Sequence, residues 1–379
     1  MSPVADVQPA RLVVEAVRTL SPYIPGKPIT ELQREYGVHD IVKLASNENP
    51  WGPSEKSLAA MRAALADVWL YPDGSSHELR GEVARFHRLP PECITLGNGS
   101  NELLMFLCEC LLTPRYNAVY SQYGFAIYPL VIRATGAEAR AAAALPADSA
   151  MPFGHDLQAM AAACDANTRL VFIANPNNPT GTWLDNDALK RFIAAAPADT
   201  LVVLDEAYFE YARSFGVADG TEWLREFPNL VVLRTFSKAW GLAGARVGYA
   251  LSHPDIADAM NRMRPAFNVN SIAQAGAQAA LRDPAHMSQC VAQTRVELRY
   301  LQDQLSARQL GLVPSVANFV LVRFGAKAAA LYDALLRGGV IVRPVAGYGL
   351  PEHLRISIGT RAQNQQLLQV LDAQRGRLW

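Results

Sequence analysis

The sequence predicts an α/β fold, with a large domain built on a mostly parallel sheet covered by helices and a smaller α+β domain. From about residue 45 onward, short apolar runs such as Leu201–Leu204 alternate with segments of helical periodicity. Strands that are apolar on both faces and alternate with helices are typical of a parallel sheet covered on both sides. The pattern changes near Pro254, where long helical stretches precede a second group of strands. This change indicates the smaller domain.

The individual elements can be placed in chain order. In the large domain, apolar runs predict strands at 93–97, 117–120, 168–174, 201–204 and 229–233. One helix is expected from Ser100 to Leu112, and a second, capped by Asp185, through Ala196, because both segments repeat apolar residues at helical spacing. Beyond Pro254, strands are expected at 318–324, 340–344 and 353–359.

The composition excludes several classes of protein. The chain has 379 residues, of which 50% are hydrophobic and 18% charged, so it is a globular chain long enough for two domains. Its formal net charge is zero, which favours neither nucleic acid nor an anionic membrane as a partner. No apolar stretch approaches the roughly 20 residues of a membrane span.

The amino-terminal residues and the cysteines indicate a cytoplasmic protein. Charged residues such as Asp6, Arg11 and Glu15 interrupt any signal-peptide apolar core. The five cysteines have no spacing typical of a zinc site, so we expect core thiols in a reducing compartment and no bound metal; they are Cys93, Cys108, Cys110, Cys164 and Cys290.

The segment 234–249 (RTFSKAWGLAGARVGY) is the most informative in the chain. Lys238 follows an apolar strand and has small and apolar neighbours, with no carboxylate nearby in the sequence. Such surroundings favour the neutral amine, which is the form that attacks a carbonyl to make a Schiff base. Ser237 and Arg246 are a hydroxyl and a permanent cation, the groups that hold a phosphate. Together they predict a site for pyridoxal phosphate.

Three other loops follow predicted strands and carry matching groups. The Gly-rich turn 96–102 leads into a helix at Ser100, which predicts an anion site, although Ser100 could instead serve only as a helix cap. The prolines of the loop 175–181 restrict the backbone around Asn178. Asp205 ends an apolar strand, where a carboxylate needs a cation or proton donor, and a protonated pyridine nitrogen would serve.

Aromatic residues and arginines complete the candidate site. Tyr208 is expected near the ring oxygen of the cofactor, and Tyr123 could stack on the ring face, with Phe125 as an alternative. Arg343 and Arg355 lie on or after strands of the smaller domain and are suited to a carboxylate or phosphate on the substrate.

The chain resembles the fold-type-I pyridoxal-phosphate aminotransferases, and among them the histidinol-phosphate aminotransferase branch. The resemblance covers nearly the whole sequence. Its motifs are LSPYIPGKP (20–28), LASNENP (44–50), YPDG (71–74), NPNNPTG (175–181), DEAY (205–208), SKAWGLAGARVG (237–248) and LRISIGT (354–360).

This resemblance implies a role for each matched residue. Lys238 would form the internal aldimine and shuttle the proton, Asp205 would hold the pyridine nitrogen, and Asn178 and Tyr208 would bond the ring oxygen. The cofactor phosphate would be held by Ser100, Asn101, Ser237 and Arg246. Tyr71 would reach that phosphate from the partner subunit of a homodimer. The substrate would meet Tyr23, Asn178, Arg343 and Arg355.

The sequence pattern predicts a division into domains, and the resemblance implies the reaction. An amino-terminal arm (1–30) would be followed by a large cofactor-binding domain (46–265), and residues 31–45 with 266–379 would form the small domain. The implied reaction is transamination between L-histidinol phosphate and 2-oxoglutarate, giving imidazole-acetol phosphate and glutamate, in histidine biosynthesis.

Other functions are possible on the same fold. An aromatic amino acid aminotransferase is the alternative, and Trp240 and Ser121-Gln122 depart from the residues that are usual in the family at these positions, which bears on substrate fit. A lyase or decarboxylase fits the motifs less well. A transcription regulator is disfavoured because no basic helix-turn-helix precedes the enzyme portion.

Overall fold

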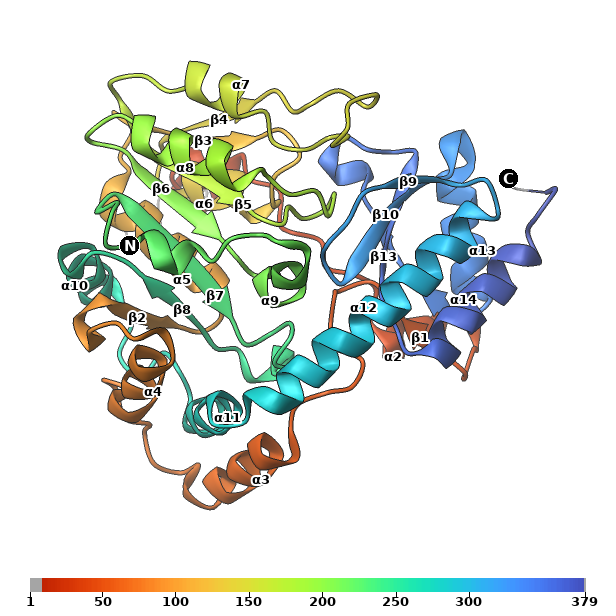
Figure 1. Cartoon of the computed structure of the whole chain (residues 1–379), viewed down its shortest axis with the longest axis horizontal. Helices are drawn as coiled ribbons and strands as arrows, with labels where there is room; N and C mark the ends of the chain where they lie inside the picture. The colour runs from red at the N-terminus through yellow and green to blue at the C-terminus, as the bar shows by residue number, and fades with distance from the viewer. Residues whose placement is uncertain (1–8, 378–379) are drawn as a thin grey trace, which may run out of the picture.

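The large sheet has seven strands, and five of them are the strands that the apolar runs of the sequence predict. The structure is a computed structural model that describes residues 9–377 (Figure 1). The strand order is β2-β8-β7-β6-β5-β3-β4, and β8 runs antiparallel to both of its neighbours while the others are parallel. The bounds are β2 Ile94–Gly97, β3 Asn117–Ser121, β4 Glu138–Ala142, β5 Thr168–Ala174, β6 Leu201–Asp205, β7 Leu230–Thr235 and β8 Gly248–Leu251.

Both faces of the central strands β5, β6 and β7 are buried, which explains why these strands are mostly apolar, whereas the edge strand β4 is partly exposed and carries a glutamate and an arginine. Alternate residues along a strand point to opposite faces. Leu170 and Phe172 of β5 therefore belong to one core cluster, with α5 and α6, whereas Val171 and Ile173 belong to another, with α4, α8 and α11. The large-domain helices are α3 Glu55–Ala64, α4 His77–His87, α5 Ser100–Leu111, α6 Ile127–Ala134, α7 Leu157–Ala162, α8 Asn186–Ala195, α9 Phe209–Ala212, α10 Pro254–Met263 and α11 Ser271–Leu281.

A second, smaller group of strands lies beside the large sheet. Four antiparallel strands have the order β12-β13-β10-β9, and β1 pairs in parallel with β11. Their bounds are β1 Val42–Lys43, β9 Gly311–Val313, β10 Phe319–Arg323, β11 Val340–Ile341, β12 Arg343–Pro344 and β13 His353–Ser357. The helices are α2 Ile29–Tyr36, α12 Pro284–Ser306, α13 Ala328–Arg337 and α14 Arg361–Asp372. The long helix α12 starts beside α11 and runs to this group (Figure 1).

Two details differ from the sequence-based prediction. The single strand expected at 340–344 is two short strands in different sheets, because Val340 and Ile341 pair with β1 whereas Arg343 and Pro344 pair with β13. Strands β4 and β8 lack an apolar run of their own, so neither was among the predicted strands. The domain boundaries, including those of the arm, stay a prediction.

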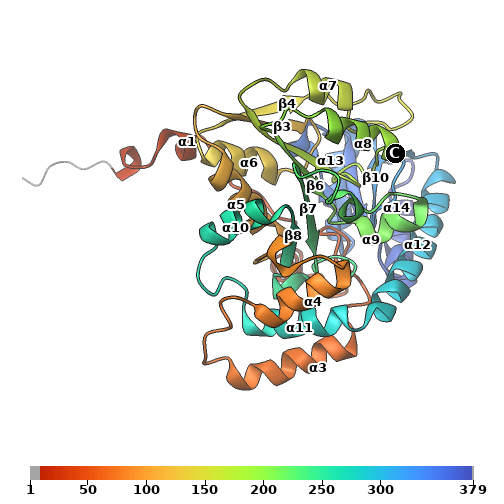
Figure 2. The same cartoon turned by 60° about the vertical axis from the view of Figure 1, so that its left-hand side comes forward.

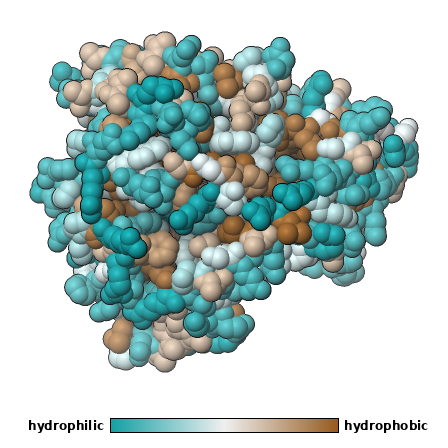
Figure 3. Space-filling view, in the orientation of Figure 1, coloured by the Kyte–Doolittle hydropathy of each residue, from teal (hydrophilic) through white to brown (hydrophobic). Residues whose placement is uncertain are grey.

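The amino-terminal region reaches across the molecule. Its helix α1 (Glu15–Arg18) contacts α6 and lies at the edge of the fold in Figure 2. Residues 20–28 follow without regular structure and pass over the cavity described below. On the face drawn in Figure 3, hydrophilic residues predominate and apolar residues gather in separate patches. Within residues 9–377, no helix is both long and apolar enough to cross a membrane.

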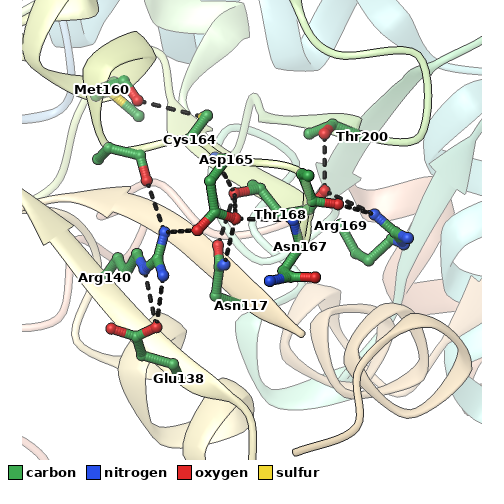
Figure 4. Close-up of polar contacts among 12 residues, drawn as sticks. Asn117, Glu138, Arg140, Met160, Cys164, Asp165, Asn167, Thr168, Arg169 and Thr200 are labelled. Carbon is green, nitrogen blue, oxygen red and sulfur yellow. Dashed lines mark hydrogen bonds and ion pairs between the residues drawn. The ribbon is translucent and has the colours of Figure 1, made fainter. Parts of the chain in front are cut away.

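The amino-terminal ends of β3, β4 and β5 are tied together by a polar cluster (Figure 4). Asp165 accepts hydrogen bonds from Asn117 Nδ2 at 2.9 Å and from Arg140 Nη1 at 2.7 Å. These two donors hold the pKa of the Asp165 carboxyl well below its ordinary value. The cluster fixes the amino-terminal ends of these strands. The carboxyl ends lie on the opposite side, where ligands bind in α/β proteins.

Candidate active site

A cavity of about 280 Å³ lies at the carboxyl ends of three neighbouring parallel strands. Ala174, Asp205 and Thr235 end β5, β6 and β7, and all three line it. The segment 45–47, Arg343 and Arg355 form the side toward the small group of strands, and Tyr23 of the arm covers it. Parallel strands thus bring residues that are far apart in the sequence to one place.

Lys238 extends into this cavity from the loop that joins β7 to β8. Its Nζ donates a hydrogen bond to the carbonyl oxygen of Ser46 at 2.9 Å. Burial lowers the pKa of this amine to about 7, and the positive charges of Arg355 and Arg246 act in the same direction. A large fraction of the amine is therefore neutral near pH 7, as nucleophilic attack on an aldehyde requires.

Asp205 presents a buried carboxylate at the end of β6. Its Oδ2 accepts a hydrogen bond from the hydroxyl of Tyr128 at 2.9 Å, and its Oδ1 accepts one from the backbone N–H of Ala207 at 3.3 Å. Burial raises the pKa of Asp205, while these donors and the nearby Lys238 oppose that rise. A positive donor in the cavity would satisfy this carboxylate further.

Tyr208 and Asn178 point toward the same space from the loops after β6 and β5. The oxygen of Tyr208 accepts a hydrogen bond from Asn47 Nδ2 at 2.9 Å, so its own O–H remains available as a donor. Burial raises the pKa of this phenol to about 12, which keeps it protonated. The side-chain oxygen of Asn178 accepts a hydrogen bond from Arg355.

An anion cradle lies at the start of α5. Ser100 and Asn101 line the cavity there, together with Ser237 and Arg246. Arg246 donates to Ser237 Oγ at 3.2 Å, and its guanidinium lies so near Gly99 that a Cβ on this glycine would be 2.3 Å from Nη2. Gly99 also has a φ of +83°. Free helix N–H groups, a hydroxyl and a guanidinium are the donors that bind phosphate.

Two arginines stand on the opposite wall. Arg355 is 5% exposed and donates to the carbonyl oxygen of Ala45 at 2.6 Å, and its Nε has no partner among the described residues. Arg343 donates to the carbonyl oxygen of Ile24 at 2.6 Å and lies 5.4 Å from the centre of the Tyr23 ring. A buried guanidinium nitrogen without a partner is suited to an anion that enters the cavity.

Eleven of the predicted site residues line this cavity, and two do not. Tyr71 is 82% exposed and stacks on Phe267 with ring centres 4.6 Å apart. The ring of Tyr123 packs edge-on against Phe153, and Phe125 lines the cavity instead. The eleven are Tyr23, Ser100, Asn101, Asn178, Asp205, Tyr208, Ser237, Lys238, Arg246, Arg343 and Arg355.

The structure adds residues to which the sequence argument gave no role. The segment 45–47 supplies a carbonyl to Arg355, a carbonyl to Lys238 and the Asn47 amide to Tyr208. Asn47 is itself held by Ser357, whose hydroxyl donates to its Oδ1 at 2.8 Å. The motif LASNENP marked this segment, but two of its three contacts are made by backbone oxygens, which no residue pattern reveals.

The site has the composition of a cofactor pocket. It combines hydrogen-bond donors suited to a phosphate at the start of α5, a buried carboxylate, side chains that can donate hydrogen bonds and an amine of lowered pKa. These groups fit pyridoxal phosphate, and they define the class of enzyme that carries this cofactor on a lysine.

Comparison with known proteins identifies the family. Residues 39–371 match the family described as aminotransferase class I and II. The chain is 51% identical over 362 residues to histidinol-phosphate aminotransferase 2 of Pseudomonas aeruginosa, covering 95% of this chain and 96% of that protein. It is 49% identical over 362 residues to histidinol-phosphate aminotransferase 1 of Nitrosococcus oceani, covering 96% of each. The chain therefore belongs to the class I and II aminotransferases.

Solved structures agree with this assignment. The histidinol-phosphate aminotransferase of Sinorhizobium meliloti, in complex with pyridoxal-5'-phosphate, superimposes with a TM-score of 0.86 at 30% identity, over 95% of this chain and 98% of that one. A Thermus thermophilus aspartate aminotransferase with maleate gives a TM-score of 0.80 at 22% identity, over 95% of this chain and 99% of that one, which supports the fold alone.

Proposed function

We propose that this aminotransferase uses pyridoxal 5'-phosphate to transfer the amino group of L-histidinol phosphate to 2-oxoglutarate, giving imidazole-acetol phosphate and glutamate in histidine biosynthesis. The single observation that carries the choice of reaction is the set of relatives at about half identity over nearly the full chain, which bear the name of that activity. The lysine, carboxylate and phosphate cradle in one cavity support the choice of cofactor.

The cofactor-binding residues divide into four groups by the part of the cofactor that they would hold. Ser100, Asn101, Ser237 and Arg246 would hold its phosphate. Asp205 would accept a hydrogen bond from the protonated ring nitrogen, and Asn178 with Tyr208 would donate to the ring oxygen. Lys238 would bind the aldehyde carbon. The bound group supplies an electron sink for the bonds of the substrate's amino carbon.

Lys238 has a second proposed task. Once substrate has taken the place of its amine on the cofactor, Lys238 would move a proton between the substrate's α carbon and the cofactor. An amine with a pKa of about 7 is matched to this work, because it can both accept and return a proton near neutral pH. The carbonyl of Ser46 orients the amine between these roles.

We further propose that Arg355, Arg343 and Tyr23 receive the anionic groups of the two substrates. Glutamate brings two carboxylates and histidinol phosphate brings a phosphate, so the same wall must accept both kinds of anion. Guanidinium forks bind carboxylate and phosphate in the same bidentate geometry. Arg343 contacts Ile24 and Tyr23, so the arm would lie beside that anion.

Which aromatic ring covers the cofactor face is part of the proposal. Tyr123 stays a prediction from the sequence, whereas Phe125 is favoured by its place in the cavity wall. A homodimer in the cytoplasm, with Tyr71 reaching the cofactor phosphate of the partner subunit, completes the proposal. The exposure of Tyr71 is consistent with a role outside its own subunit.

A comparison of kcat/KM for L-histidinol phosphate and L-phenylalanine, each with 2-oxoglutarate, tests the substrate. We expect histidinol phosphate to be preferred by at least about tenfold, which corresponds to about 1.4 kcal/mol of transition-state preference. A tenfold preference for phenylalanine would favour the aromatic amino acid aminotransferase and overturn the proposal.

A further inference from the structure

Tyr128 stands behind Asp205 and does not line the cavity. Its hydroxyl donates to Asp205 Oδ2 at 2.9 Å from helix α6, which packs against the sheet. The side chain is fully buried, and its ring stacks on Phe172 of β5 with centres 4.9 Å apart and planes 13° apart. The stacked ring leaves the hydroxyl little freedom to point elsewhere.

Asp205 needs such a donor because it is a buried carboxylate. Burial favours its neutral form and raises its pKa, and the Tyr128 hydrogen bond is the largest of the contributions that oppose this rise. The other groups that face the pair are Lys238, which also favours the charged aspartate, and the neutral phenols Tyr208 and Tyr348. Burial holds the pKa of Tyr128 well above its ordinary value, so it stays a donor.

We propose that Tyr128 is a positioning residue, which keeps Asp205 ionised and fixes which carboxylate oxygen is left to face the cavity. This inference rests on the proposed function, because the ionised aspartate matters where it binds a protonated ring nitrogen. With Oδ2 held by Tyr128 and Oδ1 reached by the N–H of Ala207, the carboxyl group has one orientation. A protonated aspartate would lose the charge that holds the ring nitrogen in its protonated form.

The substitution Tyr128→Phe separates this role from packing, because phenylalanine keeps the ring that stacks on Phe172 and removes only the hydroxyl. We expect the variant to bind pyridoxal phosphate about tenfold more weakly, equivalent to about 1.4 kcal/mol. We also expect the pH at which cofactor affinity declines in acid to rise by about one unit, since the aspartate then protonates sooner. Both are measured by titrating apoenzyme with the cofactor and following its visible absorbance.

Tyr120→Phe is the matched control. Tyr120 is a buried tyrosine of the adjacent strand β3, in the same core cluster, with burial as the main cause of its raised pKa. We expect its loss of a hydroxyl to leave cofactor affinity and its pH dependence as in the wild type. An equal change in both variants, or no change in Tyr128→Phe, would overturn the inference.

A double-mutant cycle with Asp205→Asn adds a readout that a packing role would not move. If Tyr128 acts through the Asp205 charge, Tyr128→Phe should have little further effect on cofactor affinity in the Asp205→Asn background. Additive losses would contradict the inference.

A second experiment applies if Tyr128→Phe fails to fold. Placing 3,5-difluorotyrosine, a stronger donor of similar shape, at position 128 should shift the acid decline of cofactor affinity to lower pH, and an unchanged decline would refute the role. A wild-type protein that binds no pyridoxal phosphate would overturn the proposed function as well.

Discussion

Lys238 is the residue on which the proposed reaction depends most directly. We expect Lys238→Ala to lose the absorbance change that glutamate produces in the cofactor-loaded enzyme and to reduce turnover by about 10⁴-fold, since both the aldehyde attachment and the proton transfer are removed. Lys190→Ala, which changes a surface lysine paired with Glu226, should retain both signals and serves as the control. Turnover within tenfold of the wild type would exclude Lys238 from the chemistry.

At this scale the sequence predicted most of the candidate site, for a physical reason. Asp205 ends an apolar strand, and Lys238 and Asn178 follow two others by a few residues, so a parallel sheet must bring them to the same end of the strands. Tyr128 could not be found in this way, because its role depends on the path of α6 across the sheet and its hydroxyl looks like that of any core tyrosine. The choice between Tyr123 and Phe125 likewise depends on side-chain direction rather than on residue type.

At the scale of elements, strand β7 contains one buried charged side chain, which the apolar run that predicts the strand does not indicate. Arg234 is 3% exposed and donates from Nε to Glu206 at 2.7 Å and from Nη2 to Asp219 at 2.8 Å. Its guanidinium also lies 3.9 Å from the centre of the Phe209 ring. The network ties β6, β7 and the loop after α9 together directly behind the loops that carry Asp205 and Lys238.

We expect Arg234→Met to destabilise the protein by about 3–5 kcal/mol, because it leaves three carboxylates without their cation in the interior. These carboxylates belong to Glu206, Glu210 and Asp219. Denaturant unfolding and the thermal midpoint measure the effect. Arg262→Met is the control: Arg262 is paired with Asp258 on the surface, where an ion pair contributes less than about 1 kcal/mol. A loss below about 1 kcal/mol for Arg234→Met would show that the network is not a structural support.

A strand could be predicted from the sequence when both of its faces are buried, because nearly all of its residues are then apolar. Strands β5 and β6 are apolar on both faces and were located by that pattern alone. Strand β8 contains glycine and alanine beside Tyr249, and its antiparallel pairing with β7 depends on how the Lys238 loop turns back. The division of 340–344 between two sheets depends on the positions of β1 and β13, which lie far away in the sequence.

At the scale of the whole molecule, two buried histidines should make the free energy of unfolding depend on pH. Burial lowers the pKa of His87 to about 3 and that of His155 to about 4, so the folded state resists protonation that the unfolded chain accepts near pH 6.5. The stability they contribute is present above pH 6.5 and is lost as pH falls toward 4, by about 1.4 kcal/mol per pH unit for each group. Urea unfolding between pH 7 and 4.5 should show this decline.

His87→Gln isolates one of the two contributions, because other groups also titrate in acid. The His87 ring makes a 2.9 Å hydrogen bond with the hydroxyl of Tyr249, which a glutamine amide can also bond. As the pH is lowered, we expect the free energy of unfolding of the variant to fall by about 1.4 kcal/mol less per pH unit than that of the wild type. Parallel pH profiles for the wild type and His87→Gln would mean that His87 is not held neutral by the fold.

The proposed dimer predicts that two inactive variants can restore each other. Tyr71 lies in an exposed apolar stretch with Val68, Trp69 and Leu70, of the kind that marks an interface. In a hybrid of Lys238→Ala and Tyr71→Ala subunits, one of the two sites would combine an intact Lys238 with an intact Tyr71 from the other chain, provided that Tyr71 acts across the interface. The other site would lack both residues.

Unfolding and refolding the two variants together should therefore return about a quarter of the wild-type activity, since half of the dimers are hybrids and each has one complete site. Each variant refolded alone sets the background, and the double variant carrying both changes on one chain gives no such gain when treated in the same way. If Tyr71 served its own subunit, every hybrid site would lack one of the two residues. Activity that stays at the background would then place Tyr71 outside the partner's site, while recovery requires both a dimer and a shared site.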